Sequence, residues 1–190
     1  EELEELLGDD SVQVRRSAAE ALGRLKDPAA VAKLLAASNG IRDRVLEHSI
    51  IYALIEIAEP GATRKGLKAP GVETRRVSLL ALDQMDGGAL ESAAVIAFMQ
   101  AENPATRQTA GWILSHHPEW NKALAGALRP KVEKNLPTPG RLKPLLAQLG
   151  GHPALRELLD AAIRSGGLAG PSRDVLLATL AKRPIAAPPP

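Results

Sequence analysis

The residues best suited to chemistry gather in one short stretch of the sequence. His116 and His117 are followed by Glu119 and Trp120, and Trp112 stands one helical turn earlier. Imidazole and carboxylate groups can bind a metal ion or move protons. Adjacent side chains on a helix point about 100° apart, however, so two neighbouring histidines do not converge on one ion. We therefore interpret the stretch as a helix end followed by a turn, with Trp120 in the core, and predict no metal site.

Two aromatic residues have a histidine four positions away. Trp112 is followed by His116, and Tyr52 is preceded by His48. Both aromatics stand two residues before a leucine that recurs along the chain, so they occupy equivalent positions of a repeat. Because aromatic residues dominate binding hot spots, these four residues are candidates for binding a protein partner. The alternative is that this position lies in the seam between repeats, where aromatic side chains fill space.

Basic residues indicate a third kind of site. Two groups lie near predicted turns: Arg64, Lys65, Lys68, Arg75 and Arg76, and Arg129, Lys131, Lys134, Arg141 and Lys143. Such groups can follow the phosphates of a nucleic acid. The formal net charge is only +2, and no aromatic residues are interleaved with the basic ones. We therefore keep nucleic-acid binding only as an alternative function.

The rest of the composition excludes several classes of chemistry. The absence of cysteine excludes disulfides, thiolate metal sites, a cysteine nucleophile and covalently attached haem within this stretch. Phosphate-binding glycine loops and the common hydrolase and metalloprotease motifs are also absent. The longest apolar stretch, Ser49 to Ala58, contains Glu56 and is too short to cross a bilayer. We predict no catalytic residues, no cofactor and no membrane span in this segment.

The elements that carry these residues follow a repeat. Alanine and leucine dominate while aromatic residues make up 2%, which favours packed helices over sheets. An apolar or small quartet at positions i, i+3, i+4 and i+7 recurs six times, each on one face of a helix. The quartets are Ala18-Ala21-Leu22-Leu25, Ile50-Ala53-Leu54-Ile57, Ser78-Ala81-Leu82-Met85, Ala110-Ile113-Leu114-His117, Leu142-Leu145-Leu146-Leu149 and, weakly, Leu176-Thr179-Leu180-Arg183. Their third members are spaced by 32, 28, 32, 32 and 34 residues.

Second helices are predicted between the quartets. Their apolar stripes are Val31-Leu34-Leu35, Leu90-Ala94-Ala97-Phe98, Trp120-Leu124-Ala127-Leu128 and Leu155-Leu158-Leu159-Ile163. Proline marks the first turn of such helices at Pro28, Pro60, Pro118 and Pro153, and Asp27 is a plausible N-cap. The second helix of the second repeat, Gly61 to Lys68, is short and poorly patterned. Two helices per unit of about 32 residues, stacked side by side, predict an all-α solenoid.

The segment from Asp9 to Gly23 resembles the start of a short HEAT repeat, where an acidic turn precedes an arginine and an Ala-Leu helix. An arginine seven residues before the repeated leucine recurs as Arg15, Arg75, Arg107 and Arg173, and Glu47 and Pro139 interrupt the series. The resemblance covers residues 1–183. It implies a right-handed α-solenoid of about six short HEAT-like helical hairpins, a fold that serves many binding roles.

A narrower resemblance rests on three runs, Asp43 to Glu56, Ala81 to Gly88 and Trp112 to Trp120. They are similar to the HEAT segment of large bacterial membrane-bound dehydrogenases, which also contain a sugar-dehydrogenase-like propeller and a c-type cytochrome. This chain has neither propeller strands nor the Cys-x-x-Cys-His motif that attaches haem. The resemblance therefore implies a helical spacer in an extracytoplasmic protein whose redox chemistry lies outside this segment.

These observations predict one HEAT-like repeat domain over residues 1–183, with a Pro-rich tail or linker at residues 184–190. Because the sequence opens with Glu1 instead of Met, we expect a piece of a longer protein. We interpret it as a non-catalytic helical-repeat scaffold or protein-interaction module. Its partner would be another protein or a neighbouring domain of the same chain. The dehydrogenase–cytochrome spacer and a nucleic-acid-binding HEAT-like protein are the alternatives.

Overall fold

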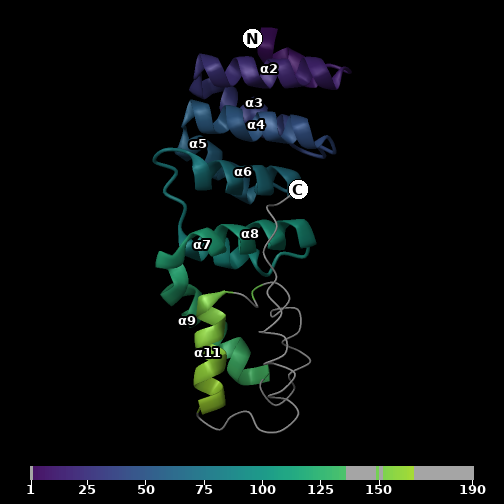
Figure 1. Ribbon diagram of the computed structural model, residues 1–190. Helices are drawn as coiled ribbons and strands as arrows, with labels where there is room; N and C mark the ends of the chain where they lie inside the picture. Colours follow the sequence, from purple (N-terminus) through teal and green to yellow (C-terminus); the bar gives the residue numbers. More distant parts are fainter. Residues whose placement is uncertain (1, 136–148, 150–151, 165–190) are drawn as a thin grey trace. The chain divides into compact units, whose positions relative to one another are not determined.

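A computed structural model describes residues 2–135, 149 and 152–164 (Figure 1). Every regular element in this described part is helical, which confirms the predicted all-α fold of helical hairpins. The chain divides into two compact units, one ending at Glu91 and one beginning at Ser92. The fifth and sixth predicted quartets, except for the buried Leu149, lie outside the described residues, as does the Pro-rich tail.

Unit 1 is built on three long helices, α2 (Val12–Leu25), α4 (Arg44–Ile57) and α6 (Val72–Gln84). They lie side by side in Figure 1, and α4 packs against both α2 and α6. The shorter second layer contains α3 (Val31–Ala37) and α5 (Pro60–Thr63), and α5 continues as a 3-10 turn over Arg64–Lys68. This short, irregular piece is what the weak pattern of residues 61–68 predicts. At the start of the chain, α1 (Glu2–Glu5) and the 3-10 turn Leu6–Gly8 pack against α2.

The repeated leucines form the interior of these hairpins, as predicted. Leu22, Leu54 and Leu82 are buried in unit 1, and Leu114 is buried in unit 2. Every member of the second and third quartets is also buried. Leu25 was predicted to be a core residue as the last member of the first quartet, and this was wrong because 65% of its surface is exposed. In the described part of unit 1 no hairpin precedes α2, so nothing covers the end of that helix.

Local signals start and stop the helices where the sequence predicts. The Asp27 carboxylate accepts a hydrogen bond from the Ala29 N–H at 2.9 Å, so Asp27 is an N-cap. Pro28, Pro60, Pro118 and Pro153 each occupy the first position of a helix or 3-10 turn. The C-termini of α2 and α4 are capped by residues other than glycine. Lys26 and Ala58 end these helices in the left-handed region, at φ 53° and 54°.

Unit 2 contains α7 (Ser92–Phe98), α8 (Pro104–His116), a 3-10 turn over Pro118–Trp120, α9 (Asn121–Asn135) and α11 (Pro153–Arg164). In this unit α7 packs against α8 and α9, and α9 packs against α11. The apolar residues Leu124, Leu128, Leu155, Leu158 and Leu159 are buried as predicted.

The predicted stripe of α7 needs correction. We expected Leu90, Ala94, Ala97 and Phe98 to line its buried face. Leu90 precedes the helix, Ala97 is exposed, and Val95 is the fully buried residue. Because α7 packs against both α8 and α9, its most buried residue is Val95, which lies one position away from the predicted stripe.

Candidate functional site

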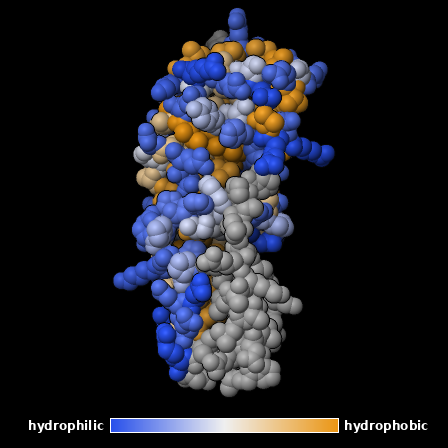
Figure 2. Space-filling view, in the orientation of Figure 1, coloured by the Kyte–Doolittle hydropathy of each residue, from blue (hydrophilic) through white to orange (hydrophobic). Residues whose placement is uncertain are grey.

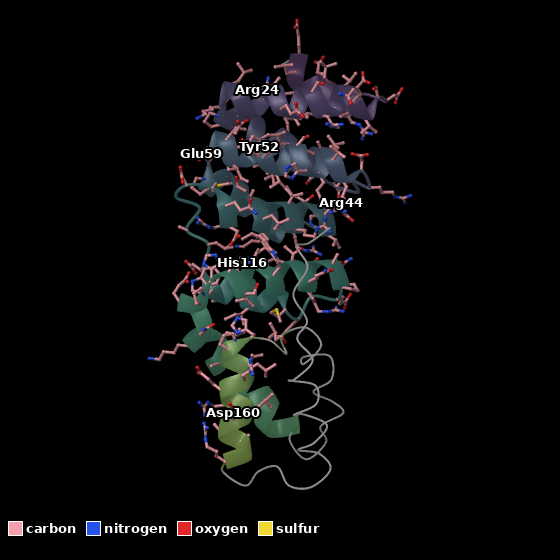
Figure 3. The ribbon with its side chains drawn as sticks, viewed as in Figure 1. Arg24, Arg44, Tyr52, Glu59, His116 and Asp160 are labelled. Atoms are coloured by element: carbon pink, nitrogen blue, oxygen red, sulfur yellow. The ribbon has the colours of Figure 1, made fainter. Side chains whose placement is uncertain are left out.

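Tyr52 is on the solvent side of α4 in unit 1 (Figure 3). Its surface is 53% exposed, and the exposed His48 ring lies one turn earlier with ring centroids 6.5 Å apart. Val45, three residues before His48, is 48% exposed. Residues at i, i+3 and i+7 share one face of a helix. We call the surface of Val45, His48 and Tyr52 the α4 stripe.

Tyr52 does not fill space between two hairpins, as the alternative interpretation expects, because more than half of its surface is exposed. The equivalent residue of α6, Leu80, is buried, as a seam residue would be. The equivalent residue of α2, Glu20, is partly buried and accepts a hydrogen bond from the Ser49 hydroxyl at 3.3 Å. Tyr52 instead points to solvent. The same repeat position is therefore exposed in the hairpin of α4 and buried in the following hairpin, which begins with α6.

Trp112 and His116 form a second aromatic–histidine pair, at the end of α8 in unit 2. Their ring centroids are 4.4 Å apart and the rings are tilted by 46°. His116 Nδ1 is 2.8 Å from the Trp112 carbonyl oxygen, which fits an N–H donated to the helix end. Trp112 is half-buried and His116 is exposed. These two residues, four positions apart in the sequence, are thus neighbours in the structure.

His117 has a separate set of partners and does not converge with His116. Its ring stacks on Trp120, with centroids 3.9 Å apart and an interplanar angle of 10°. Its Nδ1 lies 2.5 Å from Glu119 Oε1, and this hydrogen bond lowers the pKa of the exposed Glu119 carboxyl. Trp120 was predicted to lie in the core, but it is only half-buried because it belongs to the 3-10 turn and packs on His117. Within the described residues no group of three or more candidate ligands could hold a metal ion.

His152 is a buried histidine that sequence reasoning missed. It precedes α11, where its Nδ1 accepts a hydrogen bond from the Ala154 N–H at 3.3 Å. Its Nε2 lies 3.2 Å from the carbonyl oxygen of Leu114 on α8 and is placed to donate to it. Both bonds are satisfied by the neutral ring with its proton on Nε2. His152 therefore ties the start of α11 to α8 within unit 2.

We expect the stability of unit 2 to rise with pH across the titration of His152. Burial lowers the pKa of His152 below its ordinary value of 6.5, and the bond to the Leu114 carbonyl only partly opposes this. The unfolded chain then binds the proton more readily, so stability is complete above pH 6.5 and falls as the pH drops toward the lowered pKa. Urea unfolding followed by the fluorescence of Trp112 and Trp120, both in unit 2, measures this slope. A His152→Gln variant should flatten it, and an unchanged slope in that variant would contradict the assignment.

Polar bonds join the long helices of unit 1 across the stack. Glu47 of α4 pairs with Arg76 of α6, and Arg76 Nε lies 3.1 Å from Glu47 Oε1 with a further contact through Nη2. Both side chains are largely withdrawn from solvent. Glu47 interrupts the arginine series in the sequence, and the structure shows that it pairs instead with a basic residue of the next hairpin.

The repeated arginine has a structural role. Arg75 Nη1 donates to the carbonyl oxygens of Ala69 and Pro70 at 2.6 and 2.8 Å. Arg107 Nη1 donates to the corresponding carbonyls six and five residues earlier, Ala101 and Glu102, at 2.7 Å each. Each arginine therefore clamps the loop that leads into its own helix. Arginine recurs at this position in the sequence, and at Arg75 and Arg107 it makes the same two hydrogen bonds to backbone carbonyls.

Several basic residues of the first group, which could have followed the phosphates of a nucleic acid, are bonded within the protein instead. Arg75 and Arg76 are engaged as described, and Arg64 donates to the carbonyls of Gly88 and Ala89 at 3.1 Å each. Lys65 and Lys68 of the same group are exposed. In the second group, Arg129 is the only residue whose side chain is among those that the structure describes, and it is exposed. Three of the five first-group cations thus serve the fold.

Residues 1–55 match the family model of HEAT repeats. This segment resembles HEAT repeats. It contains the helices from α1 to nearly the end of α4, so the likeness begins with the first hairpin and reaches into the second. A search of curated proteins finds no match to the chain.

The HEAT-like fold indicates a helical-repeat scaffold or interaction module. Among the described helices none is long and apolar enough to cross a membrane. The resemblance to the dehydrogenase–cytochrome proteins receives no support from these comparisons and stays a prediction from the sequence.

Proposed function

We propose that this chain is a non-catalytic HEAT-like module that binds a protein partner, or a neighbouring domain of its own polypeptide, through the α4 stripe. The observation that carries the proposal is the exposure of Tyr52. The sequence contains only four aromatic residues, and this one is more than half exposed on a helix whose inward face is fully packed. An exposed aromatic beside apolar and imidazole groups is the composition of an interaction hot spot.

The geometry of the stripe supports recognition of a protein segment. Val45, His48 and Tyr52 follow one line along α4, so a helix or an extended segment laid along α4 contacts all three. The stripe offers apolar area at Val45, an apolar ring with a hydroxyl at Tyr52 and a hydrogen-bonding imidazole at His48. Trp112 and His116 offer a similar pair on α8, and we propose them as a second contact for a partner.

We expect Tyr52→Ala to weaken binding of the partner about 30-fold, the effect of losing a hot spot of about 2 kcal/mol. A photo-crosslinking amino acid at position 52 first identifies the partner in cells of the source organism. Isothermal titration of the purified partner against the full chain then gives the dissociation constant. Because Tyr52 is exposed, its removal should leave the helix content and the thermal midpoint unchanged.

Two variants control this experiment. Tyr52→Phe keeps the ring and should bind within a few-fold of the parent, and Lys33→Ala changes an exposed residue of α3 and should have no effect. An unchanged affinity in Tyr52→Ala would remove the α4 stripe from consideration. An unchanged affinity in Trp112→Ala would remove the second contact alone.

A further inference from the structure

Four positions at α4 and four at α6 form a stripe that packs toward the preceding hairpin. On α4 they are Leu46, Ser49, Ala53 and Ile57; at α6 they are Thr74, Val77 and Ala81 in the helix and Met85 at its C-cap. Their spacing of i, i+3, i+7 and i+11 is one stripe along a helix. All eight residues are buried, including Ile57 at 7% exposure and Met85 at 5%.

Specific contacts fix the direction of this stripe. The Ser49 hydroxyl donates to Glu20 of α2 at 3.3 Å. A Cβ atom placed on Gly23 of α2 would lie 2.8 Å from the Cα of Ala53, so Gly23 and Ala53 meet where the two backbones come close. On α6, Thr74 lies 3.0 Å from the Ser38 hydroxyl at the end of α3. In the second and third hairpins the stripe therefore packs against the hairpin before it.

None of the residues of the same stripe on α2 is buried. Its members are Val14, Ser17, Ala21 and Leu25, which are small or apolar and carry no charge. Ser17 is exposed, Val14 and Ala21 are partly exposed, and Leu25 is 65% exposed. Leu6, in the 3-10 turn that packs against α2, adds an apolar side chain that is 39% exposed. Apolar surface is visible at this end of unit 1 in Figure 2.

This composition is unusual for the free end of a stack. Terminal repeats of helical-repeat proteins carry a polar outer face, because no neighbour covers them. The α2 stripe instead has the residue types of the covered stripes on α4 and α6. Serine occupies the position of Ser49, alanine the position of Ala53, and leucine the position of Ile57.

We propose that the stripe of Val14, Ser17, Ala21 and Leu25 is a docking face for a further helical hairpin of the HEAT-like type. The occupant follows from the α2–α4 interface. A long helix with a glycine and a glutamate spaced like Gly23 and Glu20 would receive Ala21 and Ser17, just as α2 receives Ala53 and Ser49. Leu25 would then be covered as Ile57 is. This face is independent of the α4 stripe, so either proposal can fail alone.

The test extends the full chain by one hairpin. A copy of residues 9–40, which has the 32-residue spacing from Leu22 to Leu54, is inserted between Gly8 and Asp9. The first helix of the inserted copy therefore presents, to the stripe of the original α2, the side that normally receives α4. We expect the thermal midpoint, measured by circular dichroism, to rise by at least about 4 °C over the parent chain, because a new apolar interface forms. Helical ellipticity should increase in proportion to the added helices.

Matched variants separate docking from other effects. Leu25→Glu in the parent chain should shift the midpoint by less than about 2 °C, because the residue is exposed, whereas Ile57→Glu should unfold unit 1. In the extended chain, Leu25→Glu in the downstream copy should abolish the gain. An added copy that stays unfolded, or an extended chain no more stable than the parent, would overturn the proposal. Dimerisation of the parent chain that Leu25→Glu abolishes would assign the face to a second copy and overturn it as well.

Discussion

Replacing Glu47 by alanine is expected to destabilise unit 1 by about 3–5 kcal/mol. Glu47 and Arg76 form an ion pair between α4 and α6 whose side chains are only 8% and 13% exposed. Removal of the carboxylate leaves the guanidinium withdrawn from water without its counter-ion, and the desolvation of that charge is no longer offset. An exposed pair would lose only about 0–1 kcal/mol on the same substitution.

Urea unfolding followed by far-ultraviolet circular dichroism measures the loss in Glu47→Ala. Tryptophan fluorescence provides an internal reference, because both tryptophans belong to unit 2. The double variant Glu47→Leu/Arg76→Met removes both charges and should recover most of the lost stability, since apolar residues of similar size can replace a buried ion pair. A loss below about 1 kcal/mol in Glu47→Ala would show that the pair behaves as a surface pair.

Gly23→Val is expected to cost about 3 kcal/mol, the upper end of the usual range for overpacking. A Cβ atom at Gly23 would lie 2.8 Å from the Cα of Ala53 and 2.7 Å from Glu56 Oε2. The Glu56 side chain can rotate away, but the Ala53 Cα belongs to the backbone of α4. Relief therefore requires α2 and α4 to separate along the apolar surface that holds unit 1 together.

Gly61→Ala is the matched control for this substitution. Apart from its chain neighbours and the nearby backbone of its own helix, no heavy atom lies within 4 Å of a Cβ atom built at Gly61, which is in α5 of the same unit. Alanine there should raise the stability by about 0.5–1 kcal/mol, because a helical glycine loses more conformational entropy on folding. The two variants compared by thermal and urea unfolding distinguish crowding from helix propensity. Similar stabilities for Gly23→Val and the parent chain would contradict a tight α2–α4 contact.

Much of the fold follows directly from the sequence period. The leucines at positions 22, 54, 82 and 114 are buried because residues on one face of an amphipathic helix turn inward together. The proline and Asp27 signals mark helix starts because they act through neighbouring backbone groups alone. Tyr52 and His48, like Trp112 and His116, meet because residues four apart are neighbours on any helix.

Other features depend on contacts between hairpins, which a period does not encode. Leu25 satisfies the pattern of a core residue but is exposed, because burial also requires a neighbour on the correct side. Val95 is buried in place of Ala97 because α7 packs against two helices. The Glu47–Arg76 pair joins residues 29 positions apart that occupy neighbouring columns of the repeat, so no single column predicts it. His152 lacks a local motif, and its partner on α8 is 38 residues away.

The arginine clamps have a consequence for how this chain tolerates insertions and deletions. Arg75 and Arg107 hold carbonyls at the same two offsets, although the leucine spacing is 28 residues in one case and 32 in the other. The lead-in segment therefore has a fixed length, and the difference between the two spacings falls elsewhere in the hairpin. The shorter one indeed has only α5 and a 3-10 turn as its second layer. In these two cases a difference in repeat size is thus taken up outside the lead-in segment, so we expect insertions or deletions of a turn to be tolerated in the second layer and not between the clamped carbonyls and the arginine.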